Sequence, residues 1–345
     1  MGKSKKMSSV NSVEKPWSSW HQKIHARLLR YPDLLPKDSD LLLAISGGQD
    51  SMALLKIILD LRRIYKWNIF IWHGDHGWHQ NSKVFKNELQ RWCKSKDLIF
   101  FSNETSKENT CSEEKARKWR YNCLSERAEE ISNKNKITYI LTGHTGSDKA
   151  ETFILNLARG ADIKGLCSIP ESRELGKDLQ LVRPLLCLSR EETAQICKDF
   201  SLPILLDPTN ENKEISRNRV RQEIIPVLEK LHPGCSLRIS ALAERISHSK
   251  MEKEALLNFI LENMKLNLGI SRTKLNTFPI QVRITILAHW IQSIGAPSLS
   301  TKSLEELIIK MKITKAKGSS NFGKSWSISW EKDCIIISNS LNNKS

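Results

Sequence analysis

The stretch LLLAISGGQDSMALL, which spans residues 41–55, decides how this 345-residue chain is organised. The apolar run Leu41–Ile45 predicts a buried strand, and apolar residues resume over Met52–Tyr65 at the spacing of a helix. Between these two segments lies Ser46–Ser51, a polar turn with two adjacent glycines. We therefore expect a strand, a tight glycine turn and a helix.

A turn of this kind is suited to holding phosphate. Gly47 and Gly48 let the backbone approach an anion closely, and the following helix directs unpaired N–H groups and the positive end of its dipole at the turn. No lysine follows the glycines, so the turn is not a Walker loop, and it lacks the GxGxxG spacing of dinucleotide-binding proteins. Asp50 stands there instead, and a carboxylate beside phosphates suggests a shared Mg²⁺ ion. The turn resembles the loop of the ATP pyrophosphatases, although a glycine turn without any ligand is the alternative.

Strands and helices alternate along the chain after this turn. We expect strands over Trp67–Trp72, Leu98–Phe101, Ile137–Leu141 and Arg183–Leu186, and helices over Val84–Lys96, Ser112–Ser132, Asp148–Ala158 and Ser189–Phe200. This alternation predicts an α/β fold with a doubly wound parallel sheet. In such sheets ligands bind at the carboxyl ends of the strands.

The chain is expected to contain two domains. Residues 1–36 are expected to form an N-terminal tail and a short helix, and residues 37–232 the catalytic domain. Pro233 and Gly234 break the helical pattern, so we place a smaller, mainly α C-terminal domain at residues 233–345. That domain is expected to end in a β-hairpin around Glu331-Lys332-Asp333.

Composition and charge restrict the partners of the chain. The net charge of +16 favours a polyanionic partner such as nucleic acid, although a basic surface that serves solubility is the alternative. No apolar run approaches the ~20 residues of a membrane helix. The eight cysteines are scattered without a C-x-x-C pair, and no export signal is evident. We therefore expect reduced thiols, a cytoplasmic location, and neither a zinc nor an iron–sulfur site.

Polar clusters follow the predicted strands. After the second strand come His73, Asp75, His76 and His79. A metal site formed by these histidines would need further ligands, and no cysteine or carboxylate cluster nearby in the sequence completes such a set. We favour Asp75 as a contact to adenosine or ribose, while a packed histidine cluster without a ligand stays open.

Arginines on the long helix over Ser112–Ser132 form a second cluster. Arg117 and Tyr121 are four residues apart and share one face of this helix, and Arg120 lies three residues from Arg117. An arginine pair can hold phosphate of ATP or nucleic acid through bidentate hydrogen bonds. A solvated basic helix face is the commoner alternative.

Two carboxylates open the helix after the fourth strand. Asp148 and Glu151 are three residues apart, so both face one side of the helix start, shortly after His144. They suit a cationic amine or a metal ion, although spacing alone favours a helix cap. Farther along, the sequence RNRVR at residues 217–221 opens another helix with Arg217, Arg219 and Arg221.

Taken in order, seven blocks of this chain resemble the tRNA(Ile)-lysidine synthetases over about residues 40–230. The blocks are SGGQDS, Asp75–Gly77, Ala116-Arg117 with Arg120-Tyr121, GHTGSDKAET at 143–152, Arg159-Gly160 with Gly165-Leu166, Arg183–Leu186, and RNRVR at 217–221. The resemblance implies a ligase that uses ATP to adenylate the wobble cytidine of the minor tRNA(Ile) with a CAU anticodon. The amine of L-lysine then displaces AMP from C2, so the partners are ATP, L-lysine and this tRNA.

The resemblance also implies roles for individual residues. Asp50, Arg117 and Asp148 would be catalytic, with Asp50 on Mg²⁺ and Arg117 at the α-phosphate, and Asp148 and Glu151 would bind lysine. The ATP-binding residues would be Ser46, Gly47, Gly48, Gln49, Asp50 and Ser51, and the contacts to tRNA or the active site would come from Arg120, His144, Arg217, Arg219 and Arg221.

The chain departs from the family pattern in one block. Ser147-Asp148-Lys149 stands where the family usually has two aspartates followed by glutamine. Ser147 therefore has no carboxylate to offer a metal ion, whereas Asp148 keeps the carboxylate that the resemblance assigns to lysine binding. A thiolation-type PP-loop enzyme and a catalytically inactive tRNA binder are the alternatives, and a homodimer is left open as the oligomeric state.

Overall fold

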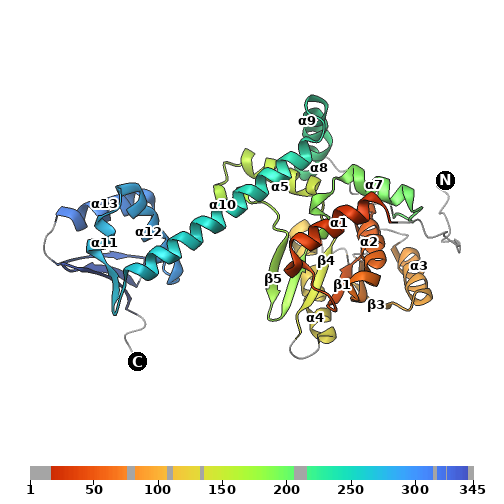
Figure 1. Ribbon diagram of the computed structural model, residues 1–345, viewed down its shortest axis with the longest axis horizontal. Coiled ribbons are helices and arrows are strands. Elements are labelled where there is room, and N and C mark those ends of the chain that lie inside the picture. The colour runs from red at the N-terminus through yellow and green to blue at the C-terminus, as the bar shows by residue number, and fades with distance from the viewer. Residues whose placement is uncertain are drawn as a thin grey trace. The chain divides into compact units, whose positions relative to one another are not determined.

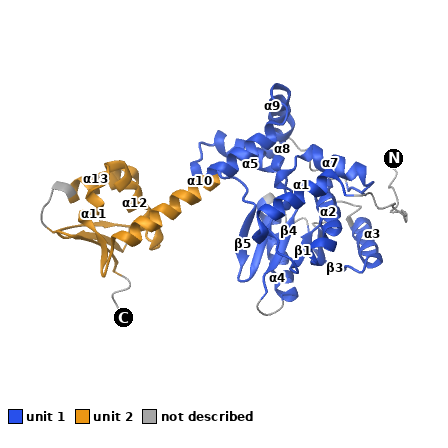
Figure 2. Cartoon of the chain, viewed as in Figure 1, with its two compact units in different colours: residues 1–246 blue, residues 247–345 orange. Residues whose placement is uncertain are grey.

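The computed structural model describes residues 17–75, 82–106, 112–132, 136–205, 216–313, 317–323 and 325–340. The chain divides into two compact units, residues 1–246 and 247–345 (Figure 2). The division falls inside α10 (Cys235–Met264), downstream of the boundary that we placed at Pro233. The predicted tail over residues 1–16 lies outside the described residues.

A six-stranded sheet forms the centre of the first unit, with the order β3-β2-β1-β4-β6-β5 (Figure 1). Its strands are β1 (Asp40–Ala44), β2 (Asn68–Asp75), β3 (Ile99–Glu104), β4 (Thr138–Thr142), β5 (Ser172–Gly176) and β6 (Leu179–Val182). All neighbouring pairs are parallel except β5 and β6, which pair antiparallel at one edge. The predicted doubly wound, mainly parallel sheet is confirmed.

Both faces of this sheet are covered by helices, which explains why β1 is apolar throughout. Leu41 and Leu43 are buried in the core formed with α1, α2, α3 and α7, whereas Leu42 is buried on the opposite face under α4. Successive side chains of a strand point to opposite faces, so a strand buried on both faces needs a continuous apolar run. These helices span Ser19–Arg30 (α1), Gln49–Tyr65 (α2), Ser82–Ser95 (α3), Glu113–Ile131 (α4) and Arg190–Asp199 (α7).

The strand order reverses between β1 and β4, and this is where ligands bind in open α/β sheets. The turn after β1 leads into α2, and the loop after β4 leads into α5 (Gly146–Ala158). The two connections touch: a Cβ atom on Gly143 would lie 2.9 Å from the backbone of Asp50 and Ser51. Glycine at position 143 therefore allows the loop after β4 to approach the turn after β1.

The segment Arg183–Leu186 was wrongly predicted as a strand. The strand β6 ends at Val182, and Pro184–Cys187 forms a short 3-10 helix, η2. Pro184 has no N–H group for a sheet ladder and has a φ angle that suits the first turn of a helix. The hairpin of β5 and β6 was not predicted; its turn contains Asp178 at φ 58°.

The helix predicted after Arg217 forms, but in three parts. These are α8 (Ser216–Arg219), a π-helical turn η4 (Val220–Ile224) and α9 (Ile225–Leu231). Pro226 follows the π-helical turn. A proline cannot donate the usual helical hydrogen bond and crowds the carbonyl four residues earlier, which favours a wider turn just before it.

The second unit combines helices with a five-stranded antiparallel sheet of order β7-β8-β11-β10-β9. Its other elements are α11 (Arg272–Asn276), α12 (Ile280–Ser293), α13 (Thr301–Ile313), β7 (Lys265–Leu266), β8 (Gly269–Ser271), β9 (Gly318–Phe322), β10 (Trp326–Trp330) and β11 (Cys334–Asn339). The hairpin predicted around Glu331-Lys332-Asp333 is confirmed as the antiparallel pair of β10 and β11. None of the helices in the described part of the chain is long and apolar enough to cross a membrane.

We predict that Gly143→Ala destabilises the catalytic unit by about 1–3 kcal/mol, the usual cost of overpacking. The added methyl group would meet backbone atoms of Asp50 at 2.9 Å, and backbone moves less readily than the end of a side chain. Thermal unfolding of the full chain measures the effect. Gly176→Ala is the matched control, because there a Cβ atom meets only side-chain atoms at 3.5 Å or more. Equal melting temperatures for the two variants would contradict the close approach of the loops.

Candidate active site

The turn after β1 is held by its own hydrogen bonds. The Ser51 hydroxyl donates to the Gly48 carbonyl at 2.8 Å and accepts from the Gly47 N–H at 3.1 Å. The Gly48 N–H donates to the Ser46 hydroxyl at 3.4 Å. Gly47 has φ +90°, a conformation that favours glycine. The turn is thus preformed, and α2 begins directly after Gly48.

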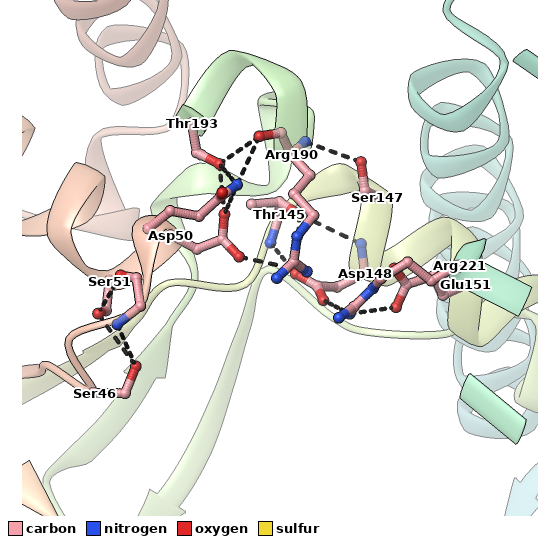
Figure 3. Close-up of polar contacts among 12 residues, drawn as sticks. Ser46, Asp50, Ser51, Thr145, Ser147, Asp148, Glu151, Arg190, Thr193 and Arg221 are labelled. Carbon is pink, nitrogen blue, oxygen red and sulfur yellow. Dashed lines mark hydrogen bonds and ion pairs between the residues drawn. The ribbon is translucent and has the colours of Figure 1, made fainter. Parts of the chain in front are cut away.

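Asp50, in the first turn of α2, is fixed by residues of α7 (Figure 3). The Thr193 hydroxyl donates to Asp50 Oδ1 at 2.5 Å, and Arg190 Nη1 lies 3.7 Å from Asp50 Oδ2. The Gln49 amide donates to the Arg190 carbonyl at 2.9 Å and so ties the turn to the same helix. Burial raises the pKa of Asp50, and the charge of Asp148 adds to this rise against the opposing effect of Arg190. A cation bound beside this carboxylate would offset part of the cost of its burial.

Asp148 takes part in the cap of α5, which was the alternative to binding an amine or a metal ion. The backbone N–H and the hydroxyl of Thr145 donate to Asp148 Oδ2 at 2.8 and 2.9 Å. The other oxygen, Oδ1, accepts from Arg217 Nη2 at 2.9 Å and lies 3.4 Å from Arg221 Nη2. One oxygen therefore serves the helix, and the other belongs to a charged cluster.

Glu151 carries the larger share of that cluster. It accepts from Arg217 Nε at 2.9 Å, from Arg221 Nε at 2.7 Å and from Arg221 Nη2 at 2.9 Å, and its side chain is only 2% exposed. Figure 3 shows Arg221 beside both carboxylates. Two buried carboxylates and two guanidinium groups thus compensate one another, as buried charges require.

The charges of this cluster shift the pKa values of two groups. Burial alone would raise the pKa of Asp148. The opposing effects lower this pKa to about 2; they come from the charges of Arg217 and His144, the hydrogen bond from the Thr145 backbone, and the charge of Arg221. Burial lowers the pKa of His144 to about 3, with Asp148 opposing and Arg183 reinforcing this shift. Asp148 is therefore ionised and His144 neutral at neutral pH. The His144 Nδ1 atom lies 2.9 Å from the Thr142 hydroxyl.

Other predicted site residues lie apart from this cluster. Arg219 is exposed and pairs with Glu223 at 3.3 Å. Arg117 is exposed on α4, with its guanidinium 5.4 Å from the ring centre of Tyr121, and does not contact Asp50 or Asp148. His73 is buried with its Nδ1 atom 2.7 Å from the Ile45 carbonyl, whereas His76 and His79 lie outside the described residues.

A pocket of about 290 Å³ adjoins the charged cluster. It is lined by Ser147, Glu151, Arg190, Glu191, Arg221, Ile225, Pro226 and Glu229. Its wall thus presents carboxylates and guanidinium groups together with the apolar side chains of Ile225 and Pro226 at the start of α9. This mixture suits a small ligand that carries both signs of charge and an alkyl chain.

The sequence did not point to Arg190, Thr193 or Ser147 as site residues. Ser147, at the position where the family usually has an aspartate, accepts from the Arg190 N–H at 3.0 Å and so joins α5 to α7. A signal was present: Ser189 and Glu192 form a capping box that fixes the first turn of α7. The contact of this turn with Asp50 could not be seen, because the partners are far apart in sequence.

The fold and this site define a class of nucleotide-dependent enzymes. A family model described as the PP-loop domain matches residues 20–228, and such a domain binds ATP. The solved structure of a U34-tRNA thiolase from Methanococcus maripaludis, with its [4Fe-4S] cluster, is similar with a TM-score of 0.54 and 19% identity, covering 66% of this chain and 78% of that one. At this identity the likeness shows the shared fold.

Curated relatives define the family within this class. The chain is 47% identical over 336 residues to a tRNA(Ile)-lysidine synthase of Prochlorococcus marinus, covering 96% of this chain and 100% of the relative. It is 42% identical over 325 residues to a tRNA(Ile)-lysidine synthase of Parasynechococcus marenigrum, covering 93% and 95%. The chain belongs to the tRNA(Ile)-lysidine synthase family of ligases.

We predict that Arg217→Gln destabilises the protein by about 1–3 kcal/mol at neutral pH, because buried carboxylate oxygens lose a charged donor. The pKa of Asp148 lies below its ordinary value of 3.8, so Asp148 contributes stability above that pH and loses it as the pH falls toward 2. Without Arg217, burial raises this pKa, and acid unfolding should begin at a higher pH.

The matched control is Arg219→Gln, on the same short helix, because Arg219 is exposed and pairs with the exposed Glu223 at 3.3 Å. Acid titration followed by circular dichroism compares the variants. An acid transition of Arg217→Gln that coincides with that of Arg219→Gln would show that the cluster does not stabilise the fold.

Proposed function

We propose that this protein ligates L-lysine to C2 of the wobble cytidine in the minor tRNA(Ile) with a CAU anticodon, with conversion of ATP to AMP and diphosphate. The observation that carries the proposal is the pair Asp148 and Glu151 beside the phosphate-type turn, at the point where the strand order reverses. The relatives named tRNA(Ile)-lysidine synthase, which align over nearly the whole chain, support it. A cytoplasmic location fits this role.

ATP would place its phosphates on the turn Ser46–Ser51, where backbone N–H groups and the start of α2 favour an anion. Asp50 would hold Mg²⁺, which typically binds one or two protein carboxylates and phosphate oxygens. The position of the donor fits this role, because Asp50 lies in the first turn of α2 directly beside the glycine turn, and Arg190 Nη1 is 3.7 Å from its Oδ2 atom. Bound there, the ion would neutralise charge on the departing diphosphate.

The reaction would have two displacements. The C2 oxygen of the cytidine attacks the α-phosphorus of ATP, and the bond to diphosphate breaks. The lysine amine then forms a bond to C2, loses a proton, and AMP leaves with the former C2 oxygen. Arg117 would stabilise the charge that develops at the α-phosphate, which is an electrostatic role.

Lysine would bind through Asp148 and Glu151. Both carboxylates are already ion-paired with Arg217 and Arg221, so the ammonium group would replace guanidinium donors rather than enter an uncharged space. The pocket beside Glu151 offers the approach, and its guanidinium groups on Arg190 and Arg221 suit the carboxylate of an amino acid.

The second unit is proposed to select the tRNA. The predicted catalytic residues all lie in the first unit, and the chain has a net charge of +16. The basic run of the second unit comprises Lys310, Lys312, Lys315 and Lys317, of which Lys315 lies outside the described residues. Arg120 and Arg219 in the first unit would add contacts to RNA phosphates.

We predict that Asp50→Asn lowers the rate of lysine transfer at least about a hundredfold, since a preorganised charge at a phosphate site contributes to this extent. The substitution keeps the size of the side chain and an acceptor for Thr193. Incorporation of labelled lysine into a CAU-anticodon tRNA transcript, with ATP and Mg²⁺, measures the rate. A folded variant with near-normal activity would remove Asp50 from the mechanism.

We predict that Glu151→Gln raises the KM for lysine about 10- to 100-fold and leaves the KM for ATP nearly unchanged. A lost charge-assisted hydrogen bond costs ~1.5–3 kcal/mol, and each 1.4 kcal/mol is a factor of ten. Glu223→Gln is the matched control, because Glu223 is an exposed carboxylate that pairs with Arg219. An early-melting Glu151→Gln variant with a normal KM for lysine would leave Glu151 a purely structural role.

A further inference from the structure

Three arginines from different elements surround Tyr121 on α4. The guanidinium of Arg117 lies 5.4 Å from the centre of the Tyr121 ring, and that of Arg173, on β5, lies 5.0 Å from it. Arg183, directly after β6, also acts electrostatically on the phenol. The antiparallel edge hairpin thus brings Arg173 to a residue of the long helix, a meeting that no sequence pattern indicated.

Within the described residues, no carboxylate forms an ion pair with Arg117, Arg173 or Arg183. Arg183 is only 1% exposed; its Nη1 atom donates to the Pro170 carbonyl at 2.7 Å, its guanidinium also hydrogen-bonds to the Tyr121 phenol, and its Nε atom has no hydrogen-bond partner among the described residues. Buried charges in proteins are normally paired. A phosphate group would supply a negative charge beside these guanidinium groups.

The cluster lies beside the proposed active site. Arg183 follows Val182, which pairs with Leu141 of β4, and β4 leads through His144 to Asp148 at the start of α5. Arginine is the residue that binds phosphate through two parallel hydrogen bonds, and it stacks on aromatic rings. Tyr121 provides such a ring to both Arg117 and Arg173, so the two guanidinium groups are oriented while still partly open to solvent.

We propose that Arg173 and Arg183, together with Arg117, form a phosphate-binding site in which Tyr121 is the positioning residue. The proposal deepens the proposed function and rests on it for the choice of ligand. The phosphate belongs either to the RNA strand next to the target cytidine or to ATP. Both sources share one chemistry, and the two arms of the experiment distinguish them.

The test uses the full chain with Arg173→Gln, which removes one charge from the cluster. Lys177→Gln is the matched control, because Lys177 is exposed in the turn of the same hairpin. Filter binding of a CAU-anticodon tRNA transcript at several salt concentrations forms the first arm. Calorimetric titration with ATP forms the second arm, and thermal unfolding checks that both variants fold.

An RNA phosphate at the site predicts that Arg173→Gln flattens the slope of log K against log salt by ~0.7, the value for one contact to a single strand. ATP affinity then stays the same. A phosphate of ATP predicts the opposite: ATP binds about tenfold more weakly, and the tRNA slope is unchanged. Either result supports the site, provided that Lys177→Gln behaves like the unaltered protein.

The proposal is overturned if Arg173→Gln matches Lys177→Gln in both arms. If Arg173→Gln does not fold, Arg173→Lys keeps the charge but loses the planar fork. The Arg173→Lys variant should bind the ligand that occupies the site, tRNA or ATP, more weakly. Unchanged binding of both ligands would again overturn the site. A lack of lysine transfer by the unaltered protein, combined with a positive binding arm, would refute the proposed function and leave the phosphate site standing.

Discussion

The burial of three carboxylates at the carboxyl ends of β1 and β4 is the constraint on which the rest of the site depends. Asp50 follows β1, and Asp148 and Glu151 follow β4; Asp148 and Glu151 are nearly inaccessible to solvent. Charges in such a place require cations. Arg190 on α7, Arg217 on α8 and Arg221 in the π-helical turn supply them. The elements after the sheet are therefore tied to it by charge as well as by apolar contact.

Much of the catalytic unit could be predicted because its strands and helices have strong local patterns. A strand buried on both faces must be apolar throughout, as Leu41–Leu43 are. The edge hairpin gave no such signal: β5 reads Ser-Arg-Glu-Leu-Gly and is only partly buried. The segment Arg183–Leu186 was wrongly predicted as a strand: its apolar residues belong to the short helix η2, where Pro184, Leu185 and Leu186 are buried. The burial of this segment results from tertiary packing, which the spacing of apolar residues alone does not reveal.

The same limit applies to the site. Asp50, Asp148 and Glu151 could be identified because each stands in a short contiguous block next to a strand end. Their partners Arg190 and Thr193 could not be identified, because they are far from Asp50 in sequence. Thr193 lies 143 residues after it. Arg217 and Arg221 were expected at the active site or on tRNA. Their pairing with the carboxylates joins segments that are 66 to 70 residues apart in sequence, which a local helical pattern does not reveal.

This pairing has a consequence for selectivity under the proposed function. A buried pair of carboxylates that already accepts hydrogen bonds from guanidinium groups can accept them from an ammonium group instead. An ammonium group that takes the place of an arginine donor keeps these oxygens hydrogen-bonded, whereas a neutral side chain that displaced the same donor would leave carboxylate oxygens buried and unpaired, at ~1–3 kcal/mol or more for each. Discrimination against uncharged amino acids therefore follows from the cost of the unpaired acids, and the size of the pocket need not provide it.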